Sequence, residues 1–247
     1  MRDRLSEFPF DAELTPGARN AVRVCLRIQP SEKVTVITDL ACKEIAASIV
    51  REIEAVGAPY DAFLLEDLGV RPMHDMPQEI LDDLESSQVS VYTVQAQPNE
   101  LRTRMQMTDV VNRRKIRHAH MVNIERKIML EGMRADFLKV DELSVKIWEI
   151  ATGAKAIHAR TAAGTEITAE LNKDYKWVKT SGIISTEKWG NLPGGEVFTT
   201  PGEVNGKFVI DGVVGDYLCA KYGDLREAPL TVNVKHNRIT DLHSDNR

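Results

Sequence analysis

The stretch Lys33-Val34-Thr35-Val36-Ile37-Thr38 decides the first half of the fold. It is short and rich in β-branched residues, which is typical of a buried strand. Apolar residues then recur at helical spacing, and Gly57 is placed to end that helix. These residues are Cys42, Ile45, Ala46, Ile49, Ile53 and Val56. The stretch therefore predicts a strand followed by a helix that packs on it.

The same alternation continues outward in both directions. Upstream, Thr15-Pro16 is a typical helix start, and Pro30 ends that helix. Downstream, further strands are expected over residues 60–65 and 89–94, with a short helix from Pro77 to Ser86 between them. This β-α-β-α-β order predicts a parallel sheet with right-handed crossovers.

The turn after the first strand does not have a nucleotide-binding sequence. It contains Asp39-Leu40-Ala41-Cys42, without a glycine-rich phosphate motif, and the Asp39 carboxylate would repel a pyrophosphate. We therefore expect a scaffold or a substrate wall rather than a cofactor domain. Asp39 is expected to cap the following helix.

The middle of the chain is predicted to be helical. One helix is expected to run from Thr108 or Asp109 to Gly132, and a second from Asp136 to Gly153. His118 and His120 lie in the first of these helices. Residues two apart point to different sides of a helix, so the two imidazoles are not expected to share a metal ion.

The residues after Gly153 have the pattern of strands. Residues 156–161 and 166–171 predict a hairpin around Gly164, and more strands are expected at 208–210, 213–214, 230–234 and 239–242. The expected fold class is α/β. A Rossmann-like parallel βαβ domain over residues 1–110 would be followed by an α+β domain over residues 111–247.

Composition narrows the class of protein. The 247 residues are 43% hydrophobic and 28% charged, which is ordinary for a globular protein, and a net charge of −5 argues against nucleic-acid binding. No apolar run approaches the roughly 20 residues of a membrane span, and the N-terminus does not resemble a signal peptide. Three cysteines without a C-x-x-C pair favour a reducing compartment. We therefore expect a cytoplasmic protein with no membrane or nucleic-acid partner.

Charge is nevertheless unevenly distributed. Residues 61–87 are strongly acidic and residues 101–127 strongly basic. Two solvated helix faces would explain this pattern, as would a contact between subunits or a surface that steers an anionic ligand.

The loop around Glu196 is the strongest candidate for chemistry. Residues 189–201 contain three glycines, two prolines and one carboxylate. Glycines allow a ligand to approach the backbone and prolines fix the flanks, so Glu196 could be held rigidly toward a cation. The alternative is a tight surface loop with a solvated glutamate.

The string Asn191-Leu-Pro-Gly-Gly-Glu-Val-Phe-Thr-Thr-Pro201 resembles the glutamate motif of the aminopeptidase T family, the thermophilic leucyl aminopeptidases. Residues 131–136, 161–168 and 211–212 resemble other segments of that family, so the resemblance covers nearly the whole chain. It implies a homodimeric metallopeptidase in which a pair of zinc or cobalt ions activates water to remove the N-terminal residue of a peptide. Glu196 would be a metal ligand, and Asn191, Gly194 and Gly195 would shape the substrate cleft.

The resemblance assigns no catalytic residue and leaves the metal site incomplete. The family's second ligating glutamate and its histidine ligands come later than the segment matched by residues 234–247, so we expect a fragment, a truncated product or a descendant without catalysis. Two alternatives remain open. Dihydroxypyridine dioxygenases resemble the same fold family and hold one iron(II) ion by two histidines and a carboxylate. A metal-free binding or oligomerisation module is the other.

Overall fold

The computed structural model describes residues 5–245, which divide into two compact units. The first unit runs to Val145 and also includes Lys179–Glu196, and the second contains Lys146–Val178 and the residues from Val197 onward. The sequence led us to expect a single boundary after residue 110. The structure places the division later because the fourth and fifth strands of the parallel sheet both belong to the first unit.

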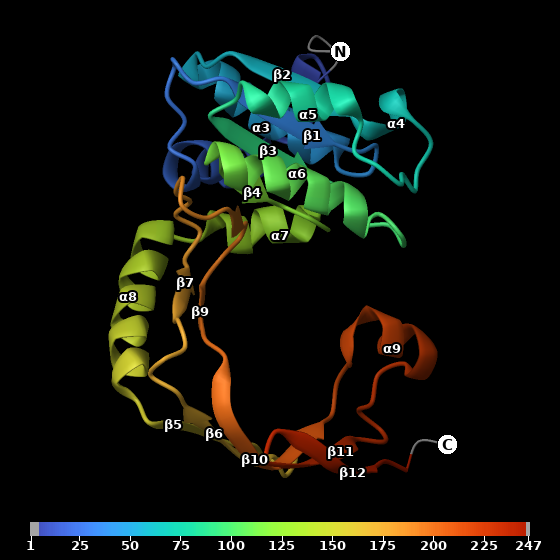
Figure 1. Cartoon of the computed structure of the whole chain (residues 1–247). Coiled ribbons are helices and arrows are strands. Elements are labelled where there is room, and N and C mark those ends of the chain that lie inside the picture. The colour runs from blue at the N-terminus through green and yellow to red at the C-terminus, as the bar shows by residue number, and fades with distance from the viewer. Residues whose placement is uncertain (1–4, 246–247) are drawn as a thin grey trace. The chain divides into compact units, whose positions relative to one another are not determined.

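The first unit contains the predicted parallel sheet (Figure 1). Its strand order is β2-β1-β3-β4-β8, and every pairing is parallel. All residues of β1 and β3 are buried, as expected for strands covered by helices on both faces. The strands are β1 (Val34–Thr38), β2 (Tyr60–Leu64), β3 (Val89–Thr93), β4 (Arg117–His120) and β8 (Gly190–Asn191). The α/β fold class is thereby confirmed.

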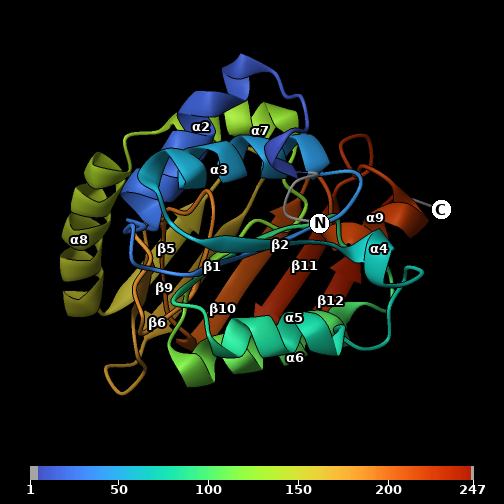
Figure 2. The same cartoon turned by 90° about the horizontal axis from the view of Figure 1, so that it is seen from above.

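Helices cover this sheet on both faces, and each face has its own hydrophobic core (Figure 2). On one face α3 packs with the N-terminal helices and α7, and on the other α5 packs with α6. The helical segments are η1 (Ala12–Leu14), α2 (Thr15–Arg19), η2 (Asn20–Cys25), α3 (Lys43–Val56), α4 (Leu65–Leu68), α5 (Gln78–Glu85), α6 (Leu101–Arg114), α7 (Arg126–Leu130), η3 (Gly132–Arg134) and α8 (Phe137–Gly153).

The long helix predicted up to Gly132 is wrong. Helix α6 ends at Arg114, Lys115 takes the left-handed conformation with φ 56°, and the chain then forms strand β4. Tertiary pairing overrides the local pattern here, because Arg117–His120 hydrogen-bonds beside β3 in the middle of the sheet. The next predicted helix is confirmed as α8.

The acidic and basic segments pair with each other within the chain. Arg113 and Arg114 of α6 both contact Glu85 of α5, and Arg102 contacts Asp75 at 2.9 Å. These ion pairs explain part of the complementary charge, and a contact between subunits through these segments stays a prediction.

The second unit contains an antiparallel sheet with strand order β12-β11-β10-β6-β5. The hairpin around Gly164 is confirmed, whereas residues 213–214 form no strand and instead precede a helix that the sequence did not predict. The elements are β5 (Ala156–Arg160), β6 (Glu166–Leu171), β10 (Pro201–Ile210), α9 (Gly215–Tyr222), β11 (Leu230–Lys235) and β12 (Arg238–His243). Two short strands, β7 (Val178–Thr180) and β9 (Glu196–Phe198), pair separately.

Between residues 5 and 245, none of the helices combines the length and the apolar character that crossing a membrane requires.

Candidate functional site

Strand β8 attaches the Glu196 loop to the carboxyl edge of the parallel sheet. Gly190 pairs with Ala119 and Asn191 with His120, and the Leu192 amide donates to the His120 carbonyl at 3.2 Å. Leu192 is buried, which anchors the start of the loop. Open α/β sheets bind ligands outside the carboxyl ends of their strands, so the loop begins where this class of fold places its sites.

Of the two glycines predicted to bind substrate, Gly194 is required by packing and Gly195 is not. A Cβ at Gly194 would lie 2.9 Å from the Asn191 carbonyl oxygen and 2.9 Å from the Gly182 amide nitrogen, so only glycine fits between these backbones. A Cβ at Gly195 would make an ordinary contact with Val140, at 3.4 Å. Binding of substrate by Asn191, Gly194 and Gly195 stays a prediction.

Glu196 is exposed at the start of β9, and its carboxylate has one hydroxyl partner. The Thr180 hydroxyl donates to Glu196 Oε2 at 3.2 Å. Thr180 is itself held in place, because Lys179 and Ser181 on either side of it both contact the Asp141 carboxylate of α8. The loop therefore presents a carboxylate from a defined position.

A complete metal site is not assembled around Glu196 by the described residues. From residue 5 to residue 245, no group of three or more His, Cys, Asp or Glu side chains is placed to hold an ion. A catalytic ion is usually held by three protein ligands. The assignment of Glu196 as a metal ligand thus stays a prediction, and the expected zinc or cobalt pair has no support in the geometry.

His118 and His120 are buried next to this loop and contact each other, which the sequence did not predict. Ser90 Oγ lies 2.8 Å from His118 Nδ1, and His118 Nε2 lies 3.1 Å from His120 Nδ1. Burial lowers the pKa of His118 well below its usual value and, with the nearby Arg104 charge, lowers that of His120 to about 4. Both imidazoles are therefore neutral near pH 7.

Aromatic rings enclose His120 at the carboxyl edge of β3 and β4. Tyr92 stacks on it with ring centroids 5.3 Å apart, and Trp189, which precedes β8, lies 5.1 Å away. Arg104 of α6 carries the buried Nε atom that has no hydrogen-bond partner among the described residues. His118 and Tyr92 are fully buried, so this cluster is part of the packed carboxyl edge of the sheet, next to β8.

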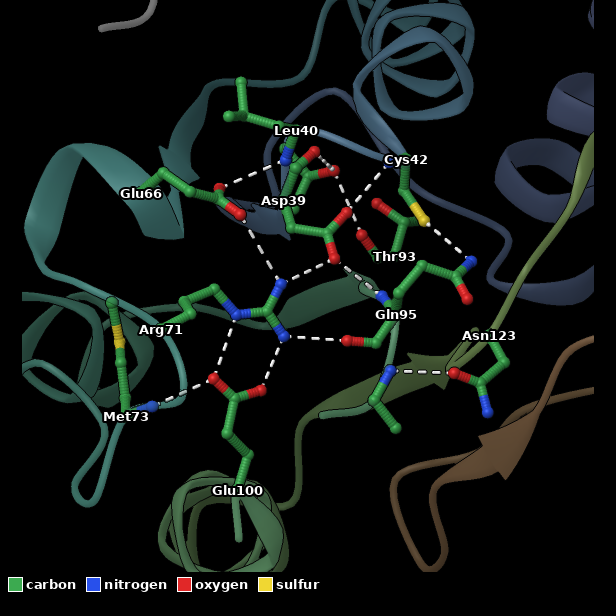
Figure 3. A network of polar contacts seen from close by, with 12 residues as sticks. Asp39, Leu40, Cys42, Glu66, Arg71, Met73, Thr93, Gln95, Glu100 and Asn123 are labelled. Carbon is green, nitrogen blue, oxygen red and sulfur yellow. Dashed lines mark hydrogen bonds and ion pairs between the residues drawn. The ribbon is translucent and has the colours of Figure 1, made fainter. Parts of the chain in front are cut away.

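A second polar cluster fills the crevice between β1 and β3 (Figure 3). The chain crosses from β1 to β2 on one side and returns to β3 on the other, which makes this crevice the point where an open α/β sheet would admit a ligand. Arg71 occupies it. Its Nη1 lies 2.7 Å from Asp39 Oδ2, its Nε lies 2.9 Å from Glu100 Oε1, and its Nη2 donates to the Gln95 carbonyl at 2.7 Å.

Further hydrogen bonds hold the two carboxylates that pair with Arg71. Asp39 accepts from the Cys42 amide in the turn before α3 and from the Gln95 amide. The N-cap of α3 is Cys42, without a side-chain hydrogen bond, so the prediction that Asp39 caps this helix is wrong. Desolvation raises the pKa of the Glu100 carboxyl, but hydrogen bonds from Arg71 and from the Met73 amide outweigh it and lower that pKa overall. The crevice is thus filled by the protein's own ion pairs, in agreement with the absence of a phosphate-binding loop.

Comparisons with known proteins agree with this fold. The structure resembles that of 2,5-dihydroxypyridine dioxygenase from Pseudomonas putida KT2440, with a TM-score of 0.70, 16% identity, and coverage of 96% of this chain and 70% of that one. It also resembles wild-type AmpT from Thermus thermophilus, with a TM-score of 0.64, 12% identity, and coverage of 94% and 71%. At these identities the likeness shows the fold alone. A search of curated proteins found no match.

A comparison with family profiles favours one of these two relatives over the other. The profile of the 2,5-dihydroxypyridine 5,6-dioxygenase family, NicX, matches residues 14–246. The predicted resemblance to aminopeptidase T is therefore confirmed as a shared fold, whereas aminopeptidase activity is not specifically supported, and the dioxygenase alternative is better supported. The match covers nearly all of the sequence, and the chain therefore belongs to the 2,5-dihydroxypyridine 5,6-dioxygenase (NicX) family.

Proposed function

We propose that this protein takes part in the metal-dependent oxidative cleavage of a hydroxylated pyridine ring. The match of residues 14–246 to the NicX family carries the proposal. The position of the Glu196 loop at the carboxyl edge of the sheet supports it, because that edge is where ligands bind in this class of fold. A bound iron(II) ion would supply the redox chemistry through which dioxygen reacts with an aromatic ring.

Glu196 is the residue that we propose as a ligand of that ion. Its carboxylate oxygen suits a hard or borderline cation, and the Thr180 hydroxyl fixes one of its two oxygens. A single carboxylate is too few, so the described residues alone do not fit a complete iron site.

Oxygen uptake by the iron(II)-loaded protein with 2,5-dihydroxypyridine tests the function. We expect oxygen and the pyridine to be consumed together, and Glu196→Gln to lower the rate at least tenfold. Glu187→Gln is the matched control, because Glu187 is an exposed carboxylate of the same segment that pairs with Lys115. The control variant should retain the full rate.

Other outcomes would favour the other functions considered. Release of p-nitroaniline from Leu-p-nitroanilide without oxygen uptake would replace the proposal with a peptidase. Equilibrium dialysis gives a readout that does not depend on turnover. If wild type and Glu196→Gln bound iron(II) equally weakly and neither reaction occurred, the metal-free module would be supported instead.

A further inference from the structure

Arg104 is the arginine of helix α6 for which residues 5–245 provide no ion pair. The other three arginines of this helix all contact carboxylates, either in α5 or in the loop that precedes it. No hydrogen bond from the described residues reaches the Arg104 guanidinium either, and its Nε atom is fully buried. A surface arginine normally keeps its charged head in water. Part of the Arg104 head is instead enclosed without a counter-charge.

The position of Arg104 is the carboxyl edge of the parallel sheet. It lies in the first turn of α6, and α6 is the helix that follows β3 in the chain. Burial raises the pKa of Tyr92 near the end of β3 and lowers that of His120 at the end of β4, and the Arg104 charge acts on both groups. These three residues belong to the first unit, so their arrangement does not involve the second unit.

The groups around this guanidinium do not supply a negative charge. Burial keeps both Tyr92 and His120 neutral near pH 7. Two carboxylates act on the Tyr92 hydroxyl electrostatically. These are Asp39 and Glu100, and both are already paired with Arg71 (Figure 3). A guanidinium that is withdrawn from water without a partner is unfavourable, and a bound anion would remove that penalty.

The rings at this edge suit a flat ligand. Tyr92 and His120 are stacked with an angle of 10° between their planes, and the Trp189 ring centroid lies 5.1 Å from that of His120. Aromatic side chains bind flat rings by stacking, and a guanidinium binds a carboxylate through two parallel hydrogen bonds. The two Nη atoms of Arg104, which have no hydrogen bond in the described part of the chain, are not enclosed as Nε is. They are therefore the atoms that an anion would meet.

We propose that Arg104 recognises a carboxylate of the ligand, so that the protein takes a hydroxypyridine that also carries a carboxylate group. This inference rests on the proposed function, which provides the hydroxylated pyridine ring. The ring lies against the aromatic side chains, and its carboxylate pairs with the guanidinium. The ligand thus supplies the counter-charge that the described residues do not. A ligand without a carboxylate leaves the guanidinium unpaired and binds more weakly.

Isothermal titration calorimetry of the whole chain tests this pairing, with iron(II) present and oxygen excluded so that binding is measured without turnover. The two ligands are 5-hydroxypyridine-3-carboxylate and its uncharged analogue 5-hydroxypyridine-3-carboxamide. A carboxylate at position 3 cannot chelate a metal together with the ring nitrogen, so chelation does not explain a preference for it.

We expect wild type to bind the carboxylate at least about tenfold more tightly than the amide, and Arg104→Gln to reduce this ratio to less than about threefold. Arg102→Gln is the matched control, because Arg102 is an exposed arginine of the same helix, two residues away. The control should keep the full ratio. A tenfold preference that persists in Arg104→Gln, or no preference in wild type, would overturn the proposal.

Thermal unfolding provides a second measurement that needs no ligand. A partly buried guanidinium without a partner does not stabilise the fold, so Arg104→Gln should melt at or above the wild-type temperature. A clearly lower melting temperature would overturn the proposal, because it would show that an acidic group of the protein pairs with Arg104.

Oxygen uptake reports separately on the reaction. Uptake with 2,5-dihydroxypyridine together with equal binding of the carboxylate and the amide would reject the role of Arg104 and leave the proposed function in place. A carboxylate preference that depends on Arg104, without oxygen uptake on any hydroxypyridine, would support the binding site and reject the ring cleavage.

Discussion

His118 and His120 lie on the same side of β4, and their facing ring nitrogens are 3.1 Å apart. In a strand, residues two apart share a face, so the expectation that His118 and His120 lie in a helix and point to different sides is wrong. Both are buried and uncharged, and one of the two nitrogens donates its hydrogen to the other. The pair continues a row of hydrogen bonds inside the sheet that starts at Ser90 of β3 and ends at His120 of β4. His120 in turn pairs with Asn191 of β8.

The buried histidines predict that the protein loses stability in mild acid. The pKa of His120 is about 4 in the folded state and about 6.5 in an unfolded chain, so the unfolded chain binds more protons between these values. The free energy of unfolding should therefore fall as pH decreases from 6.5 toward 4, by roughly 3 kcal/mol from His120, and His118 should add to this loss. Urea unfolding at pH 7.5, 6.0 and 5.0 measures this decrease in the free energy of unfolding.

Replacement of one histidine isolates this effect. His120→Gln should weaken the pH dependence between 6.5 and 5, although it lowers stability at pH 7.5. His74→Gln is the control, because His74 is exposed in the same unit. An unchanged pH dependence in His120→Gln would contradict the assignment of acid sensitivity to this pair.

The Arg71 ion pairs predict a large loss of stability when the guanidinium is removed. Arg71, Asp39 and Glu100 each expose 4% or less of their side chains. Arg71→Met would leave two buried carboxylates without their cation, which costs about 3–5 kcal/mol in comparable sites. Arg71→Lys should recover only part of this, because an ammonium cannot make the paired hydrogen bonds of a guanidinium. Denaturant unfolding at pH 7 measures all three proteins.

An exposed arginine from the same charged region serves as the control. Arg102 pairs with Asp75 in solvent, so Arg102→Met should cost less than about 1 kcal/mol. A similarly small loss of stability in Arg71→Met would show that the Asp39 and Glu100 carboxylates find other hydrogen-bond partners or become protonated.

The sequence predicted those elements whose own residues determine their structure. Val34–Thr38 is uniformly β-branched and the residues up to Gly57 follow a helical period, so the strand and helix are confirmed. Three of the four residues of Arg117–His120 are polar, and the segment becomes an interior strand because β3 and β8 flank it. The position of Arg71 beside Asp39 depends on residues 32 apart in the sequence, and no local pattern contains that information.

The close backbone contacts around Gly194 predict that this position of the Glu196 loop requires glycine. In Gly194→Ala, the new methyl group would overlap the Asn191 carbonyl and the Gly182 amide, both of which are backbone atoms. We expect a loss of about 1–3 kcal/mol, typical of overpacked sites. Gly195→Ala is the matched control, since its methyl group would only contact Val140, at 3.4 Å, and it should cost less than about 1 kcal/mol. Urea unfolding distinguishes the two, and equal stabilities would contradict the close approach of these backbones.

The three cysteines predict different reactivities toward a thiol reagent such as dithionitrobenzoate. Burial raises the pKa of both Cys25 and Cys42 to about 12, so almost none of either thiol is ionised at pH 8. Cys219 on α9 is partly exposed and should react first. We expect one fast thiol in the folded protein and three after unfolding in urea. Cys219→Ser should remove the fast phase, and a fast phase that persists in this variant would mean that Cys25 or Cys42 is accessible.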